Sequence, residues 1–121
     1  MTEVKKFKAL ERLKFNVEGL GNECNLFEKY FNGLQSLTHL KIQRIHNSND
    51  ILKDIDIYLP KLRVLYIVSR YPIAVSEEAV DTLARLSTLE ILDVLVNYNS
   101  IKQLIIDKVM KNCRKIKSID I

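Results

Sequence analysis

The side chains most able to support chemistry in this chain are two histidines and two cysteines, namely His39, His46, Cys24 and Cys113. A metal site needs several such side chains, or carboxylates, at characteristic short spacings, and no such cluster surrounds either histidine. The chain also lacks the G-x-x-x-x-G-K-[ST], G-x-S-x-G and H-E-x-x-H motifs of nucleotide-binding and hydrolytic sites. We therefore expect no metal, no cofactor and no enzymatic activity.

The two cysteines and the asparagines bear on where the protein works. Cys24 and Cys113 lie far apart, and no Asn-x-Ser/Thr acceptor occurs. Both features favour an intracellular protein, cytoplasmic or nuclear, although a disulfide between the two cysteines stays open as an alternative. Cys113 stands where a small buried residue would end a helix, so we expect an inert core thiol.

Charge and hydropathy argue against nucleic acid and membrane as partners. The 121 residues carry a formal charge of +4, from 19 basic and 15 acidic residues, well short of a concentrated basic face. The densest basic stretch, "KVMKNCRKIK" at 108–117, alternates its charges with apolar positions. It predicts a solvated rim, with nucleic-acid or anionic-surface binding as a less favoured alternative. No apolar segment approaches the roughly 18 residues of a membrane helix.

A repeated pattern organises the chain. Five stretches share one spacing of apolar residues, and their starts lie 27, 25, 27 and 27 residues apart; they are "FKALERLKF" from Phe7, "LQSLTHLKI" from Leu34, "LPKLRVLYI" from Leu59, "LSTLEILDV" from Leu86 and "CRKIKSIDI" from Cys113. A period in the twenties with the core L-x-x-L-x-L is typical of leucine-rich repeats.

The spacing within each stretch predicts a strand. The apolar gap changes from three residues to two, as expected where a chain leaves a helix and enters a strand whose alternate side chains share one face. We expect equivalent residues of successive units to stack as rungs of a buried ladder: Leu10, Leu13 and Phe15; Leu37, Leu40 and Ile42; Leu62, Leu65 and Ile67; Leu89, Leu92 and Val94; Ile116, Ile119 and Ile121.

Segments with helical spacing separate the strands. They lie at 25–34, 50–59, 76–86 and 100–113, with Ser76 and Ser100 as expected N-caps of the last two. The sequence therefore predicts an α/β solenoid that forms a single domain over 1–121. Its five parallel strands would line the concave side, with about four helices outside.

The units "VSEEAVDTLARLSTLEILDV" and "LIIDKVMKNCRKIKSIDI" resemble the repeats of F-box leucine-rich-repeat proteins. The resemblance covers the chain from Phe7 onward. It implies a concave surface that grips a protein partner, and substrate recognition for a cullin-RING ubiquitin ligase. An alternative is a structural subunit or assembly factor of a large complex.

The chain departs from that family in two respects. No F-box precedes the repeats, and of the positions that often hold an Asn or Cys after the strand, only Asn97 matches. Both ends look cut, so we expect a fragment of a longer protein, in which further repeats cover the ends. The alternative is a chain whose ends are covered by partner molecules.

The candidate binding residues lie between the rungs, where strand side chains would point to the concave side. The middle position changes from basic to apolar to acidic along the five units, and Tyr66 stands at its centre as the expected strongest contributor. The competing interpretation is a solvent-exposed face that binds no partner. The predicted partner-binding residues are Lys14, His39, Lys41, Val64, Tyr66, Val68, Ile91, Asp93, Leu95 and Asp120.

Overall fold

The computed structural model describes residues 9–16, 31–45 and 52–121, with the side chains of 44 and 45 left out of the description. Its elements in chain order are β1 (Arg12–Asn16), β2 (His39–Ile45), α1 (Ile55–Tyr58), β3 (Val64–Ser69), α2 (Glu77–Arg85), β4 (Ile91–Val94), α3 (Asn99–Asn112) and β5 (Ser118–Asp120). The described part of the protein is therefore α/β, as the sequence predicts.

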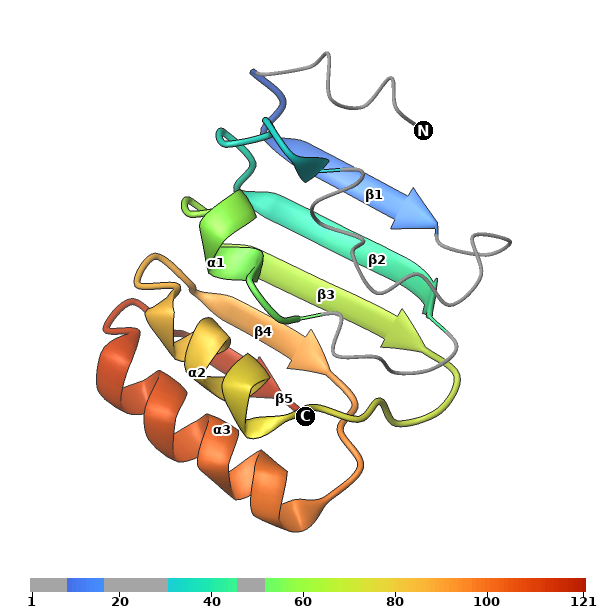
Figure 1. Cartoon of the computed structure of the whole chain (residues 1–121), viewed down its shortest axis with the longest axis vertical. Coiled ribbons are helices and arrows are strands. Elements are labelled where there is room, and N and C mark those ends of the chain that lie inside the picture. The colour runs from blue at the N-terminus through green and yellow to red at the C-terminus, as the bar shows by residue number, and fades with distance from the viewer. Residues whose placement is uncertain (1–8, 17–30, 46–51) are drawn as a thin grey trace.

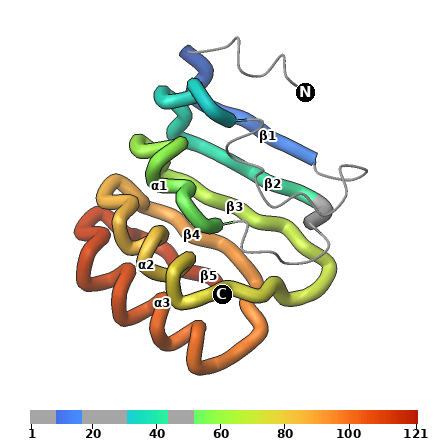
Figure 2. Tube along the Cα trace, in the orientation of Figure 1, coloured from blue at the N-terminus to red at the C-terminus, as the bar shows by residue number. Residues whose placement is uncertain are grey.

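The five strands form one parallel sheet in the order β1-β2-β3-β4-β5, so each strand is added beside its predecessor in the chain. The three helices lie together along one side of the sheet, and α2 packs against both α1 and α3 (Figure 1). The trace in Figure 2 shows the same succession, with the connections from β3 to β4 and from β4 to β5 running over the helical side. The opposite face of the sheet carries no helix of the described residues.

The strand register confirms the predicted ladder at the second and third position of each unit, as far as these lie in the strands. Leu13, Leu40, Leu65, Leu92 and Ile119 are aligned across the sheet, and Phe15, Ile42, Ile67 and Val94 form the next line. The rung residues of the middle three units are buried. Rung residues at the two ends of the sheet are only partly buried, because they have a neighbouring rung on one side. They are Leu10 and Leu13 of the first unit and Ile116, Ile119 and Ile121 of the last. Hydrophobic burial across neighbouring units thus holds the sheet together.

A repeated hydrogen-bond pattern joins the units at the start of each strand. One backbone carbonyl of each unit accepts bonds from two successive N–H groups of the next, at 2.7–3.1 Å, and the acceptors are Glu11, Thr38, Arg63 and Glu90. Because buried backbone groups must be paired, this pattern fixes the stagger between neighbouring strands. It repeats between every pair of neighbouring units.

The helices differ from the prediction in number and length. Three are described where about four were predicted, and residues 25–30 of the predicted helix at 25–34 lie outside the described residues. The helix predicted at 50–59 is the four-residue α1, which ends at Tyr58. Pro60 disfavours a helical conformation at the residue before it, which explains why this helix stops there.

One predicted N-cap is confirmed and the other is wrong. The Ser76 hydroxyl accepts a hydrogen bond from the Ala79 N–H at 3.1 Å and begins α2. Helix α3 instead begins at Asn99 with Tyr98 as N-cap, which places Ser100 inside the first turn.

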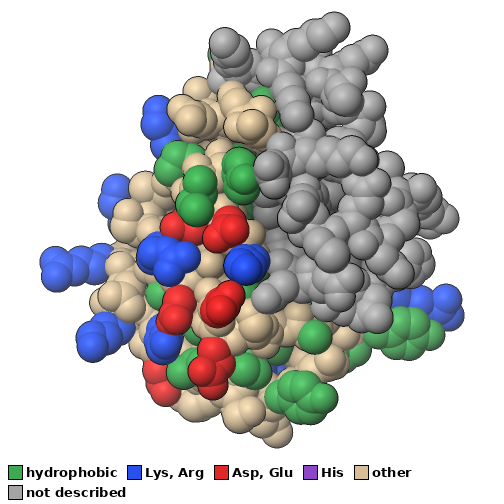
Figure 3. All heavy atoms as spheres, viewed as in Figure 1, with side chains coloured by type: hydrophobic (Ala, Val, Ile, Leu, Met, Phe, Trp, Pro, Cys, Tyr) green, Lys and Arg blue, Asp and Glu red, His purple; other side chains and the backbone are tan. Residues whose placement is uncertain are grey.

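Ion pairs link neighbouring units on the helical side. Lys53 pairs with Glu78 at 3.6 Å, Arg85 with Asp56 at 2.9 Å and Lys108 with Asp81 at 2.5 Å. Figure 3 shows acidic and basic side chains interspersed over this face. Exposed pairs of this kind contribute little each, so the helices are held mainly by their apolar faces.

Candidate protein-binding face

The sheet face opposite the helices carries three lines of side chains that the register brings together. We call the central line the middle row; it consists of Lys14, Lys41, Tyr66, Asp93 and Asp120. A second line, at the strand starts, contains Arg12, His39, Val64, Ile91 and Ser118. Toward the strand ends, Val68 aligns with Gln43, and Leu95 follows directly after β4. The predicted binding residues thus occupy one face.

The charged residues of the middle row have no ion-pair partner among the described residues. Lys14 and Asp120 are exposed, and Lys41 and Asp93 are half-buried. Among the described residues, these four side chains form no salt bridge, and the described ion pairs lie on the helical side or at the strand starts. Within the described part of the chain, these charges are therefore free to meet those of another molecule.

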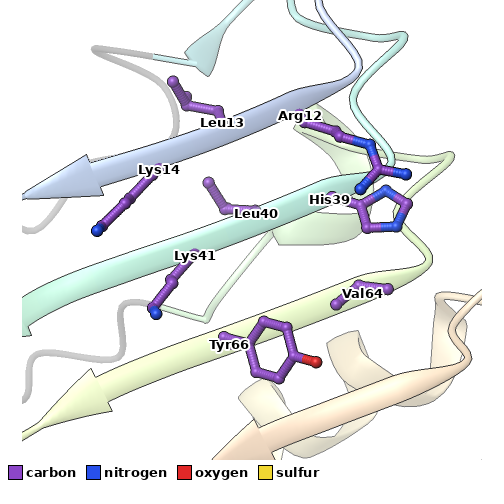
Figure 4. Close-up of a pocket in the computed structure, with 8 residues that line it drawn as sticks. All are labelled: Arg12, Leu13, Lys14, His39, Leu40, Lys41, Val64 and Tyr66. Carbon is purple, nitrogen blue, oxygen red and sulfur yellow. The ribbon is translucent and has the colours of Figure 1, made fainter.

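A hollow of about 300 Å³ lies on this face over β1, β2 and β3. Figure 4 shows Lys14 and Lys41 side by side on neighbouring strands, with Tyr66 following on β3 and with Arg12 and His39 closer to the strand starts. The lining residues are Arg12, Leu13, Lys14, His39, Leu40, Lys41, Val64 and Tyr66. Its lining combines apolar side chains with the basic side chains of Arg12, Lys14 and Lys41.

Val64 is one of the predicted partner-binding residues on this face, but it is buried. Its side chain is only 8% exposed, because it lies between His39 and Ile91, whose larger side chains flank it in the register. Val68 and Leu95 are exposed at 45% and 42%, and Tyr66 and Ile91 are half-buried. The exposed apolar surface is therefore displaced from the strand starts toward the strand ends.

His39 is a neutral side chain at neutral pH. Its pKa is lowered from the usual 6.5, first by burial and then by the nearby Arg12 and Arg63 guanidinium groups. Its Nδ1 lies 2.8 Å from the Thr38 hydroxyl oxygen. The imidazole thus contributes shape and hydrogen bonding to the hollow and no positive charge at pH 7.

An ion network that sequence reasoning missed borders the strand starts. Glu90 binds Arg63 through one carboxylate oxygen and Lys117 through the other, the latter at 2.9 Å. The hydrogen bonds from Arg63 and then Lys117 lower the pKa of Glu90 from 4.5 to about 2. Arg63, Glu90 and Lys117 occupy equivalent positions 27 residues apart. Their charges alternate from basic to acidic to basic along the repeat, and this alternation could have predicted the network.

Two exposed tyrosines at the strand ends were also missed. Tyr71 and Tyr98 follow β3 and β4 at equivalent positions, and they are 67% and 65% exposed. The loops that hold them lie side by side, because the Ile73 N–H donates to the Leu95 carbonyl at 2.7 Å. Together with Val68 and Leu95, they give this end of the sheet an exposed apolar and aromatic character, which is common at protein interfaces.

Cys113 is the reactive thiol that the structure describes. Cys113 is buried, its thiol lies 3.2 Å from the Leu86 carbonyl oxygen, and burial raises its pKa. The described residues contain no group of three or more His, Cys, Asp or Glu that could hold a metal ion. Within the same part of the chain, no helix has the length and hydrophobicity needed to cross a membrane.

Comparison with known proteins adds no relative. No family model, no curated protein and no solved structure matches the chain significantly.

Proposed function

We propose that the chain is a leucine-rich-repeat solenoid of the helix-bearing type, and that the sheet face opposite its helices binds a protein partner. The period of 25 to 27 residues supports the repeat assignment, together with the aligned rungs. The observation that carries the binding proposal is the middle row. It places charges of opposite sign on either side of Tyr66, with no ion-pair partner among the described residues, on a face that no described helix covers.

The side chains around Tyr66 suit an interface. Tyr66 is half-buried at the centre of the five strands, whereas Val68 and Leu95 are exposed toward the strand ends. Protein interfaces commonly have an apolar and aromatic centre surrounded by charged residues, and a few central residues dominate their affinity. We therefore expect Tyr66 and Leu95 to contribute most.

The proposal is tested by matched charge substitutions on the two sides of the sheet. The intact natural protein is used to purify its partners, and the affinity of each partner is then measured with Tyr66→Glu, Leu95→Glu and Ile57→Glu. Ile57 is the control, because it is an apolar side chain on α1 that is 62% exposed. The Tyr66 and Leu95 variants should each lose about 2 kcal/mol or more, the scale of central interface residues. Equal affinity of all three variants would refute binding at this face.

The biological setting we propose is substrate recognition for a cullin-RING ubiquitin ligase. This proposal is supported only by the resemblance of the repeats to those of F-box proteins. Ligase subunits should then accompany the intact natural protein in the same purification. Stoichiometric recovery of another large assembly would favour a structural subunit or assembly factor instead.

A further inference from the structure

The order of charges in the middle row restricts what kind of partner can bind. Lys14 and Lys41 stand on β1 and β2, Tyr66 on β3, and Asp93 and Asp120 on β4 and β5. The row is thus basic at one end, aromatic in the centre and acidic at the other. A partner that matches it must reverse this order of charge.

The distances along the row follow from the spacing of the strands. Neighbouring strands lie about 4.8 Å apart, so the centre of the lysine pair and the centre of the aspartate pair are separated by about 14 Å. An extended chain advances about 3.3 Å per residue, and its alternate side chains point the same way. Residues i, i+2 and i+4 of such a chain therefore reach the lysines, Tyr66 and the aspartates in turn.

We propose that the middle row binds an extended protein segment that crosses the strands and carries the pattern acidic-x-apolar-x-basic, read in either chain direction. This inference rests on the proposed function and specifies its partner. The acidic side chain lies over Lys14 and Lys41, the apolar one beside Tyr66 and the basic one over Asp93 and Asp120. The segment can run in either chain direction. The backbone hydrogen bonds of the sheet lie in its plane, so they do not pair with a segment that lies on its face and do not determine the direction of that segment.

An extended segment fits the hollow better than a second copy of this chain. In a twofold symmetric dimer, the basic end of one middle row would face the acidic end of the other, so a second copy would also match the charges. However, the hollow of about 300 Å³ lies over β1 to β3, away from the acidic end of the row. Two such faces pressed together would leave this space unfilled, whereas one side chain of a crossing segment can enter it beside Tyr66.

The test is selection from a displayed library of random 12-residue peptides against the whole chain. The wild-type protein should enrich acidic-x-apolar-x-basic peptides or the reversed order. The variant Lys14→Glu/Lys41→Glu makes the row acidic at both ends and should enrich basic-x-apolar-x-basic peptides. A control variant, Lys102→Glu/Lys111→Glu, reverses two charges on α3 and should select the same peptides as wild type.

Synthetic peptides of the two patterns then give the size of the effect. The mixed peptide should bind wild type about tenfold more tightly than the variant with the two reversed lysines, since several exposed charge pairs of modest strength change sign. This preference should weaken as salt is raised. Circular dichroism of each variant shows whether it is folded, and the exchanged preference for basic peptides cannot arise from unfolding.

The possible outcomes separate this inference from the proposed function. The inference alone would be overturned if the selected peptides required Tyr66 but lacked the charge pattern. The same conclusion would follow if wild type and the lysine variant selected the same peptides. Peptides unaffected by any substitution on the face would overturn both. A failure to select peptides would also overturn the inference, and concentration-dependent dimers lost in the lysine variant would assign the row to a second copy.

Discussion

The ladder of rungs makes the cost of removing Leu65 predictable. Leu65 is fully buried and lies between Leu40 and Leu92, which are also buried. Leu65→Ala removes three carbon atoms, worth about 2.4 kcal/mol at about 0.8 kcal/mol for each buried group. Because rungs on both sides hold the surroundings in place, a cavity remains, and the total loss should be about 3–4 kcal/mol.

Urea unfolding measures this loss directly. A small protein loses about 1–3 kcal/mol of stability per molar urea, so the midpoint for Leu65→Ala should fall by roughly 1–4 M. A domain with 5–15 kcal/mol of stability stays folded in water after such a change. Circular dichroism and tyrosine fluorescence should report the same midpoint if unfolding is two-state.

The matched control is Leu13→Ala, at the same rung position on β1. Leu13 is only partly buried, so its removal leaves a site open to solvent and should cost about 1–1.5 kcal/mol, roughly half of the transfer term. A loss for Leu65→Ala no greater than that for Leu13→Ala would refute the reasoning that each rung is stabilised by the units on both sides.

Three further predictions concern single sites. The pKa of Glu90 is depressed to about 2 in the folded protein, so its ion network stabilises the fold fully above pH 4.5 and loses this effect as pH falls toward 2. Wild type should therefore lose more stability over that range than Glu90→Gln, and parallel pH profiles would contradict the network. Ser76→Ala should cost about 1 kcal/mol and Ser100→Ala less than half of that, because only Ser76 caps its helix; equal thermal shifts would be the contrary result. Cys113 should react with iodoacetamide only at the rate of unfolding, whereas rapid labelling of this residue under native conditions would show an accessible thiol.

The strands and their register were predictable because they depend on a local rule. Alternation with a period of two marks which side chains share a face, and the repeat length sets which residue meets which in the next unit. Lys14, Lys41 and Tyr66 could therefore be assigned to one row before any coordinates. The same rule did not give the burial of Val64, because burial depends on the size of neighbours across the sheet.

The parts that were missed depend on the loops and on pairing between units. Tyr71 and Tyr98 lie beyond the strands, where the period-two rule no longer applies. The N-cap of α3 was assigned to Ser100 from a motif, although the N-cap is Tyr98, two residues earlier. Such a motif shows that a side chain could cap the helix, but it does not determine at which residue the helix begins.

The most direct test of the central claim is to locate the bound partner on the protein by cross-saturation nuclear magnetic resonance. Saturation of an unlabelled partner or selected peptide transfers only to protons of the protein that lie at the interface. The account predicts intensity losses at Lys41, Tyr66 and Asp93, with the signals of α2 and α3 unchanged. Losses concentrated on α2 and α3, with the middle row unaffected, would contradict it.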